Sequence, residues 1–274
     1  MMGAVGHKRV AKEFIENSEI PIPSLPEQKK IIRILDDVFA GISKVKKNAE
    51  KNLANAREIF SSYLNSVFSN PGDDWYEKKL GDILLKTETI NPTLNPDKEF
   101  TYIDVSSVSN INYKIVKTTK MKGKDAPSRA RKLIKTGDVI FATVRPTLRR
   151  ISIISDEYND QVCSTGYFVF RGKMNMSSSY IFYYLLTDAF NTNMEKLQKG
   201  ASYPAVTDRE VRNQAISFPK SVAVQQSIVA KLDQLSTQTK ELESIYQQKL
   251  ADLEELKKSV LQKAFNGELT EGEA

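Results

Sequence analysis

An internal repeat constrains the fold of this 274-residue chain more than any other feature. The first 70 or so residues match the last 70 or so at an offset of 197, whereas the stretch from about 72 to 199 occurs once. Matched pairs away from apolar helix positions are Gly3 and Gly200, Gln28 and Gln225, and Ser62 and Ser259. Two unrelated amphipathic helices would not share such residues, so the repeat indicates a duplicated segment on either side of a unique one.

Both copies of the repeat have the apolar spacing of a coiled coil, with alternating steps of four and three residues. The apolar positions are Ile31, Leu35, Val38, Ile42, Val45, Ala49, Ala56, Ile59 and Tyr63 in the first copy, and Ile228, Leu232, Leu235, Leu242, Tyr246, Leu253, Leu256 and Val260 in the second. Polar residues interrupt the pattern at Asn52, Thr239 and Lys249. We therefore expect two helices of about 35–40 residues, each roughly 55 Å long, that pair antiparallel.

The unique segment has the composition of a mixed α/β domain. Runs of apolar and β-branched residues predict strands, and an apolar, aromatic stretch at 180–190 has helical spacing, with Phe182, Leu185, Leu186 and Phe190 facing a core. The predicted strands cover 100–105, 139–144, 151–154 and 166–170. The expected fold class is an α/β (α+β) globular domain joined to a long antiparallel two-helix coiled coil.

Charge is concentrated in one part of the unique segment. The whole chain has a net charge of +6, but residues 114–150 hold 12 basic and two acidic side chains, so this stretch is +10 and the remainder is −4. A local positive field attracts polyanions, which favours nucleic-acid binding. A solvated basic loop is the alternative interpretation.

Several classes of site lack the residues they require. The single cysteine, Cys163, and the single histidine, His7, exclude a disulfide framework, a CxxC zinc site and a histidine-rich metal centre, and a reducing, cytoplasmic location is expected. There is no GxxxxGK[ST] loop for a nucleoside triphosphate and no GxGxxG motif for a dinucleotide. No apolar run approaches the roughly 18 residues needed to span a membrane. We therefore expect no cofactor, no metal and no catalytic residue.

The order of motifs resembles that of the specificity subunits of type I restriction–modification systems. The segment GDVIFATVRP at 137–146 is similar to their GD-I-R-P motif, and GYFVFR at 166–171 to their following strand. IPIPSLPEQ at 20–28 resembles the entry to their first helix, although the second copy departs from it, with Val224 in place of Glu27. The resemblance covers essentially the whole chain, and it is the combination of motifs with the repeat that is specific.

The resemblance implies a non-catalytic DNA-recognition protein. Family members usually hold two target-recognition domains, each followed by a spacer helix, and work with methyltransferase (M) and restriction (R) subunits. By this comparison residues 1–19 are a remnant of a first recognition domain, 20–70 the first spacer helix, 72–218 a complete recognition domain, and 219–267 the second spacer helix. Because one recognition domain is nearly absent, two copies could pair as a homodimer through their helices.

The candidate contacts to double-stranded DNA are basic and polar side chains of the unique segment. Lysine and arginine would neutralise phosphates and, with polar side chains, could read base edges. The residues expected at the DNA are Lys120, Lys122, Lys124, Arg129, Arg131, Arg145, Arg149, Arg150, Lys199, Ser202 and Tyr203. Arg145 has a structural alternative because Pro146 fixes a turn beside it. The competing function is a coiled-coil scaffold or DNA-binding adaptor without a restriction role.

Overall fold

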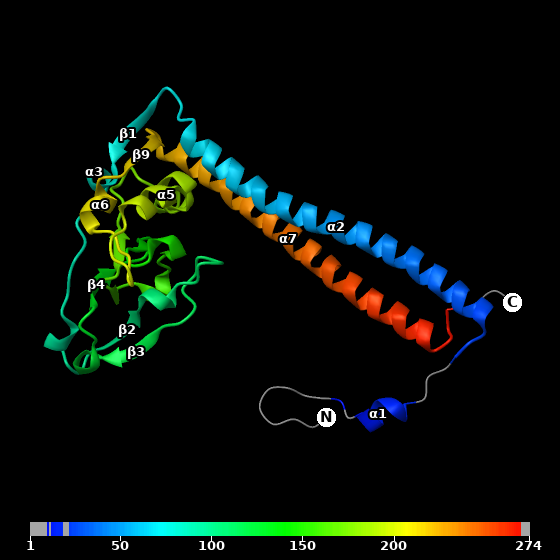
Figure 1. The fold of residues 1–274 in the computed structure, drawn as a ribbon. Coiled ribbons are helices and arrows are strands. Elements are labelled where there is room, and N and C mark those ends of the chain that lie inside the picture. Colours follow the sequence, from blue (N-terminus) through cyan, green and yellow to red (C-terminus); the bar gives the residue numbers. More distant parts are fainter. Residues whose placement is uncertain (1–9, 11, 19–21, 270–274) are drawn as a thin grey trace. The chain divides into compact units, whose positions relative to one another are not determined.

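The structure is a computed structural model that describes residues 10, 12–18 and 22–269. Most of the segment 1–19, including Gly3 and His7, lies outside the described residues, although a short helix, α1 (Lys12–Glu16), falls within it. The chain divides into two compact units (Figure 1). The globular unit spans Glu58–Thr239, and the helical unit comprises the parts of the chain on either side of it. No described helix is long and apolar enough to cross a membrane.

Two long helices, α2 (Leu25–Ser69) and α7 (Val222–Phe265), lie side by side (Figure 1). Residues 58–69 of α2 and 222–239 of α7 belong to the globular unit, and the rest of both helices to the helical unit. Lys46 Nζ lies 2.6 Å from Glu254 Oε1, and Arg57 Nε lies 2.9 Å from Glu243 Oε2. Moving forward along α2 therefore corresponds to moving backward along α7. This antiparallel arrangement, together with a mixed α/β unit, confirms the expected fold class.

The buried stripe of α2 differs from the expected heptad positions. Val45 and Ile59 are 37% and 48% exposed, whereas Leu53 and Phe60 are partly buried. The stripe thus continues through Leu53, and the exposed Asn52 does not interrupt it. An α-helix has 3.6 residues per turn, so a strict 3.5-residue repeat moves off the buried face within a few turns. Leu242 and Leu256 of α7 are likewise exposed, at 38% and 47%.

Three sheets form the globular unit. The four-stranded sheet has the order β3-β2-β7-β4, in which only β2 and β7 run parallel, and the three-stranded antiparallel sheet has the order β6-β5-β8. A two-stranded sheet pairs β1 with β9. The strands are β1 (Trp75–Lys79), β2 (Glu99–Ile103), β3 (Thr119–Lys122), β4 (Ala130–Ile134), β5 (Val139–Ala142), β6 (Ile151–Ile153), β7 (Gln161–Ser164), β8 (Tyr167–Phe170) and β9 (Ala215–Pro219).

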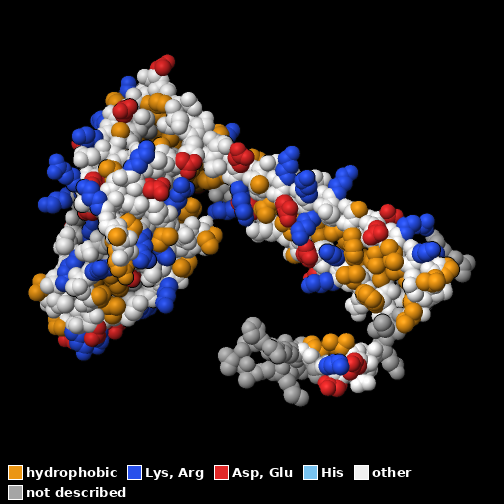
Figure 2. Space-filling view, viewed as in Figure 1, with side chains coloured by type: hydrophobic (Ala, Val, Ile, Leu, Met, Phe, Trp, Pro, Cys, Tyr) orange, Lys and Arg blue, Asp and Glu red, His pale blue; other side chains and the backbone are white. Residues whose placement is uncertain are grey.

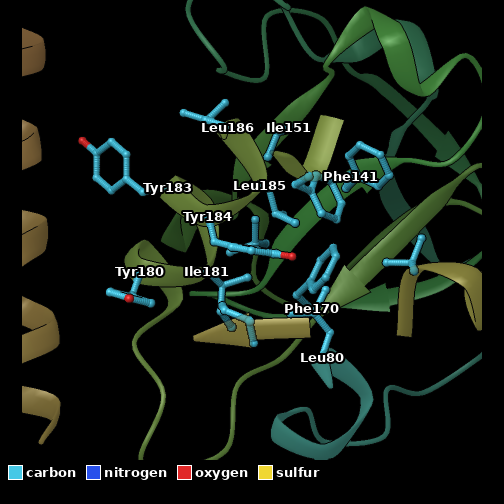
Figure 3. Packing of buried hydrophobic residues seen from close by; sticks show 14 of the residues in the cluster. Leu80, Phe141, Ile151, Phe170, Tyr180, Ile181, Tyr183, Tyr184, Leu185 and Leu186 are labelled. Atoms are coloured by element: carbon cyan, nitrogen blue, oxygen red, sulfur yellow. The ribbon is translucent and has the colours of Figure 1, made fainter. Parts of the chain in front are cut away.

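The largest cluster of buried apolar residues joins one face of the three-stranded sheet to helix α4. Figure 3 shows Phe141 and Phe170 of the sheet facing Ile181 and Leu185 of α4, and all four side chains are fully buried. The predicted core residues Leu185, Leu186 and Phe190 are buried, and Phe182 is partly buried. The shorter helices are α3 (Leu80–Ile83), α4 (Ser178–Leu186), α5 (Asp188–Leu197) and α6 (Asp208–Arg212), with 3-10 turns η1 (Pro92–Leu94), η2 (Val105–Ser107), η3 (Gly123–Asp125), η4 (Pro146–Leu148) and η5 (Asp156–Tyr158).

Candidate nucleic-acid interface

The strands of the three-stranded sheet are joined by a buried ion pair between the two most distinctive sequence motifs. Asp138 precedes β5 and Arg171 follows β8, and these strands pair antiparallel. Arg171 Nε and Nη2 each donate to the Asp138 carboxylate at 2.8 Å, and the Lys135 N–H donates to the same carboxylate at 2.8 Å. This carboxylate raises the pKa of the Arg171 guanidinium. The two motif residues therefore hold the sheet together and are not available to a ligand.

The chain leaves β5 through a strained turn at Arg145. Arg145 has φ 51° and ψ 57°, the left-handed conformation that is uncommon for residues other than glycine. Its N–H donates to the Pro204 carbonyl at 2.6 Å, and the neighbouring Val144 forms a β-bridge with Ala205. A strained backbone of this kind costs about 1–3 kcal/mol and persists only where the surroundings fix it. Here the segment 199–205 fixes it.

Three of the predicted contact residues, Arg145, Ser202 and Tyr203, meet at this turn, and Lys199 lies at the base of the same loop, where it bridges to Ala205. We call these four residues the Arg145 cluster. Arg145 Nη2 donates to the Ser202 carbonyl at 3.3 Å, and its guanidinium carbon lies 4.8 Å from the Tyr203 ring centroid. Tyr203 is 71% exposed, and Lys199 Nζ lies 3.7 Å from Glu210. A cation and an aromatic ring are thus held together on an exposed loop, where they can stack on or hydrogen-bond to a base.

Gly200 allows this loop to close. Its φ is +107°, and a Cβ at this position would lie 3.1 Å from the Tyr203 carbonyl oxygen. Lys199 and Ala205 exchange two backbone hydrogen bonds of 2.9 Å across the loop. A side chain at residue 200 would therefore disturb the place where Tyr203 and Arg145 meet.

Arg149 and Arg150 have protein partners instead. Arg149 Nη2 lies 3.3 Å from Asp188 Oδ1 at the start of α5. Arg150 Nη1 donates to three backbone carbonyls, those of Val105, Ser106 and Val108, at 3.4, 3.1 and 2.7 Å. Both guanidinium groups therefore contact neighbouring segments of the protein. Their expected contact with DNA stays a prediction.

The remaining predicted cations lie on and beside the four-stranded sheet. Lys120 and Lys122 are exposed on edge strand β3, two residues apart and hence on one face, and Lys124 is exposed in η3. Arg129 is exposed just before β4, whereas Arg131 is partly buried and its Nη1 donates to the Ala130 carbonyl at 2.9 Å. Figure 2 shows Lys and Arg side chains distributed over the visible face of the globular unit.

Backbone hydrogen bonds connect the Arg129 segment to the Arg145 cluster. The Thr165 N–H donates to the Arg129 carbonyl at 2.8 Å, and the Thr143 N–H donates to the Gly166 carbonyl at 2.8 Å. A Cβ on Gly166 would lie 2.6 Å from Val105, so these segments pack closely. The exposed cations before β4 and after β5 therefore belong to one rigid scaffold.

Sequence reasoning missed a β-hairpin at 108–115, between η2 and β3. Val108 and Ile115 form a β-bridge, and the Ser109 N–H donates to the Lys114 carbonyl at 2.9 Å. Ile111 at its tip is 84% exposed. No apolar pattern alternates throughout 108–115, and the signal in the sequence was the positive charge of the surrounding segment, where residues 105–124 contain five lysines and no acidic residue.

The described residues contain no cluster of three or more His, Cys, Asp or Glu side chains that could hold a metal ion. Cys163 is fully buried in β7, and burial raises the pKa of its thiol to about 12. At neutral pH this thiol is protonated, and protonated thiols are poor nucleophiles. The structure thus offers this side chain a packing role.

Comparison with known proteins places these features in a family context. The model of the type I restriction modification DNA specificity domain matches residues 2–53 and 72–254. The type I restriction enzyme MjaVIII specificity subunit of Methanocaldococcus jannaschii is 23% identical over 291 residues, covering 96% of this chain and 65% of that protein. The HindI specificity subunit of Haemophilus influenzae is 25% identical over 183 residues, covering 64% of this chain and 39% of that protein.

Solved structures show the same likeness. The HsdS subunit of Thermoanaerobacter tengcongensis is 36% identical with a TM-score of 0.62, and the match covers 68% of this chain and 48% of that one. A second structure, concerning complex assembly and conformational transition of the type I R-M system, is 36% identical with a TM-score of 0.66 over 70% of this chain and 50% of that one. The chain spans less than two thirds of the length of these relatives.

Proposed function

The chain belongs to the type I restriction modification DNA specificity family, and from this premise we propose that it selects the DNA sequence on which a type I restriction–modification complex acts. Residues 72–218 would form the target-recognition domain, 20–70 and 219–267 the two spacer helices, and 1–19 a remnant of another recognition domain. The chain would have no catalytic role, because methylation and cleavage would belong to M and R subunits. The observation that carries the proposal is the exposed Arg145 cluster on a rigid scaffold beside the most basic part of the chain.

The exposed cations divide naturally into two roles. Lys120, Lys122, Lys124 and Arg129 would neutralise phosphates, which positions the protein on the duplex but does not read sequence. The Arg145 cluster would read bases, because a guanidinium can donate two hydrogen bonds to guanine and an aromatic ring can stack on a base. Arg131, Arg149 and Arg150 would act indirectly through the protein contacts they make.

Selection from a pool of random duplex DNA by the purified chain tests this function. We expect enrichment of a defined sequence, with an affinity that falls as salt concentration rises because phosphate contacts release counterions. Equal affinity for the enriched and the random duplex would instead support the competing function, a scaffold or DNA-binding adaptor without a restriction role. Cutting or methylation of DNA by the pure chain with magnesium and S-adenosylmethionine would contradict the non-catalytic assignment.

The proposed partners are the M and R subunits. The amphipathic helical unit, with ion pairs such as Lys46–Glu254 on its surface, offers a long face on which another subunit could pack. Co-expression with a methyltransferase subunit encoded by a neighbouring gene should give a stoichiometric complex that survives purification. Separation of the two proteins at micromolar concentration would remove the restriction role from the proposal.

An apolar groove in the helical unit supports pairing of two copies. The groove measures about 450 Å³ and is lined by residues that include Ile22, Ile32 and Phe265, which are 77%, 56% and 70% exposed. By the 197-residue repeat, Ile32 corresponds to Val229 and Phe265 to Phe68, and in the globular unit both of these pack into the core. Figure 2 shows apolar side chains gathered on the helical unit. Exposed apolar patches of this kind commonly mark protein interfaces.

Light scattering over a range of protein concentrations tests the pairing. We expect a dimer that Ile32→Glu converts to a monomer, with Ser43→Glu, at an exposed position of the same helix, as a control that makes the same change in charge. A wild-type chain that remains monomeric at all concentrations would rule out the homodimer without affecting the DNA-binding proposal.

A further inference from the structure

The hairpin 108–115 is built as a rigid projection. Besides the bridge between Val108 and Ile115, the Tyr113 N–H donates to the Ser109 carbonyl at 3.1 Å, and the Val116 N–H donates to the Ser107 carbonyl at 2.8 Å. Figure 1 shows this segment as a green-cyan loop that projects from the body of the globular unit before β3. Its backbone is thus ordered by its own hydrogen bonds.

Two further contacts anchor the hairpin to the domain. Tyr113 adopts a left-handed conformation, with φ 57°, and its ring packs edge-on against Phe182 of α4 at a centroid distance of 6.1 Å. Arg150 holds the base of the hairpin through the carbonyls of Val105, Ser106 and Val108. A side chain that follows β5 thereby fixes a projection that lies about 40 residues earlier in the sequence. Backbone strain at Tyr113 is consistent with a fixed functional geometry.

The tip of the hairpin combines an unsupported apolar side chain with two amides. Ile111 is 84% exposed, and its neighbours Asn110 and Asn112 are exposed as well. The Ser109 hydroxyl accepts hydrogen bonds from the N–H groups of Ile111 and Asn112, which orders the turn. Single exposed apolar side chains are common on protein surfaces, so Ile111 points to a partner only together with the amides and the charge around it.

The charge around the tip identifies the chemistry of that partner. The segment 105–124 contains the five lysines Lys114, Lys117, Lys120, Lys122 and Lys124 and no acidic residue, and all five are exposed. A single-sign field of this kind favours a polyanion over a neutral protein surface. Apolar wedges flanked by asparagine and lysine are a known means of reading DNA grooves, because the apolar group contacts bases while amides bond to their edges.

We propose that the hairpin 108–115 enters a groove of the target duplex. Ile111 contacts bases, Asn110 and Asn112 hydrogen-bond to base edges, and Lys114 and Lys117 contact phosphates. This inference rests on the proposed function and adds a second reading element to the Arg145 cluster. Arg150 is a positioning residue for this element, since it touches the hairpin base and not its tip.

The experiment compares sequence selection by the full chain and its hairpin variants, using a random duplex pool and then competition binding to the sequence that the wild-type chain enriches. We expect Ile111→Ser and Asn112→Ala each to weaken binding to that sequence by about tenfold and to relax one or two positions of it. Lys114→Gln should weaken all sequences alike and reduce the salt dependence by about one phosphate contact. Val116→Ser, on the flank of the same hairpin and 60% exposed, is the matched control and should select the wild-type sequence.

Thermal unfolding confirms that each variant is folded. Ile111→Ser should leave the melting temperature unchanged, whereas Asn112→Ala removes the bond that the Lys114 N–H donates to Asn112 Oδ1 at 3.1 Å and should lower it slightly. If the wild-type chain enriches a sequence and both tip variants enrich the same one with unchanged affinity, the hairpin inference is wrong and the proposed function stands. If the wild-type chain enriches no sequence, the proposed function fails and this inference fails with it. Loss of M-subunit binding by Ile111→Ser with DNA binding intact would also overturn the inference, in favour of a protein partner.

Discussion

Replacement of Asp138 by alanine should destabilise the globular unit more than any substitution among the exposed cations of the proposed DNA-binding surface. The carboxylate accepts two bonds from Arg171 and one from the Lys135 N–H, all at 2.8 Å. The side chains of Asp138 and Arg171 are 2% and 15% exposed, so solvent screens the pair little. Alanine would leave a buried guanidinium with one carboxylate partner, Glu88, 2.6 Å from Arg171 Nη1.

The size of the effect follows from this geometry. Breaking a buried ion pair by removing one partner typically costs 3–5 kcal/mol, and because Glu88 remains we expect about 3 kcal/mol. For a unit of this size 1 kcal/mol corresponds to about 2–4 °C, so the melting temperature should fall by roughly 6–12 °C. The fluorescence of Trp75, the only tryptophan, reports on this unit because it lies in β1 and packs near Tyr180, at a centroid distance of 6.4 Å.

Two further variants distinguish the contribution of the buried Asp138–Arg171 pair from that of the exposed Glu88–Arg171 pair. Glu88→Gln acts on the same guanidinium from its exposed side and should leave the melting temperature close to that of the wild type. The double variant Asp138→Ala/Arg171→Met removes both charges and should lose less stability than the sum of the single variants. If Asp138→Ala lowers the free energy of unfolding by less than about 1 kcal/mol, or if Glu88→Gln lowers it equally, the Asp138–Arg171 pair is not the main side-chain contact that stabilises the sheet.

The neighbouring arginines should separate by assay: Arg145→Ala should lower DNA affinity with little change in melting temperature, whereas Arg150→Ala should cost about 1.5–3 kcal/mol of stability by breaking its bonds to three carbonyls. If Arg145→Ala instead lowered stability and Arg150→Ala lowered only DNA affinity, the roles proposed for the two arginines would be wrong. Cys163 should not react with iodoacetamide at pH 8 in the native protein, because burial raises the pKa of its thiol to about 12, and rapid labelling without denaturant would contradict that burial. The Thr207 N–H and hydroxyl donate to Glu210 and lower the pKa of its carboxyl below the usual 4.5, so the stability this group adds is present above that pH and is lost as pH falls through the lowered value. Urea titrations between pH 6 and pH 3 should show that the free energy of unfolding falls less with acid in Glu210→Gln than in the wild type. An equal fall in both proteins would be evidence against this role of Glu210.

The buried face of the helices shows how far periodicity alone can be taken. The repeat and its apolar steps were sufficient to predict two paired helices, and the structure has them at Leu25–Ser69 and Val222–Phe265. The exact buried positions were not predictable, because Leu53 or Asn52 could each continue the pattern and only the facing helix decides between them.

Some strands were predictable from the sequence and others only from the tertiary structure. β5 and β8 were predictable because both are fully buried and therefore continuously apolar. β1, with the sequence WYEKK and four exposed residues, has no periodic signal, and it is a strand because β9, far along the chain, lies beside it.

The sequence by itself determined the duplicated helices, the α/β class of the unique segment, and the location of its positive charge. Only the tertiary structure decided which protein groups each cation contacts. Arg145, Arg149 and Arg150 lie within six residues of one another, yet one is exposed beside Tyr203 and the others bond to α5 and to η2. The physical reason is that the fold positions each guanidinium through the acceptors that it brings to it, and for these three arginines the acceptors come from segments about 40–60 residues away in sequence.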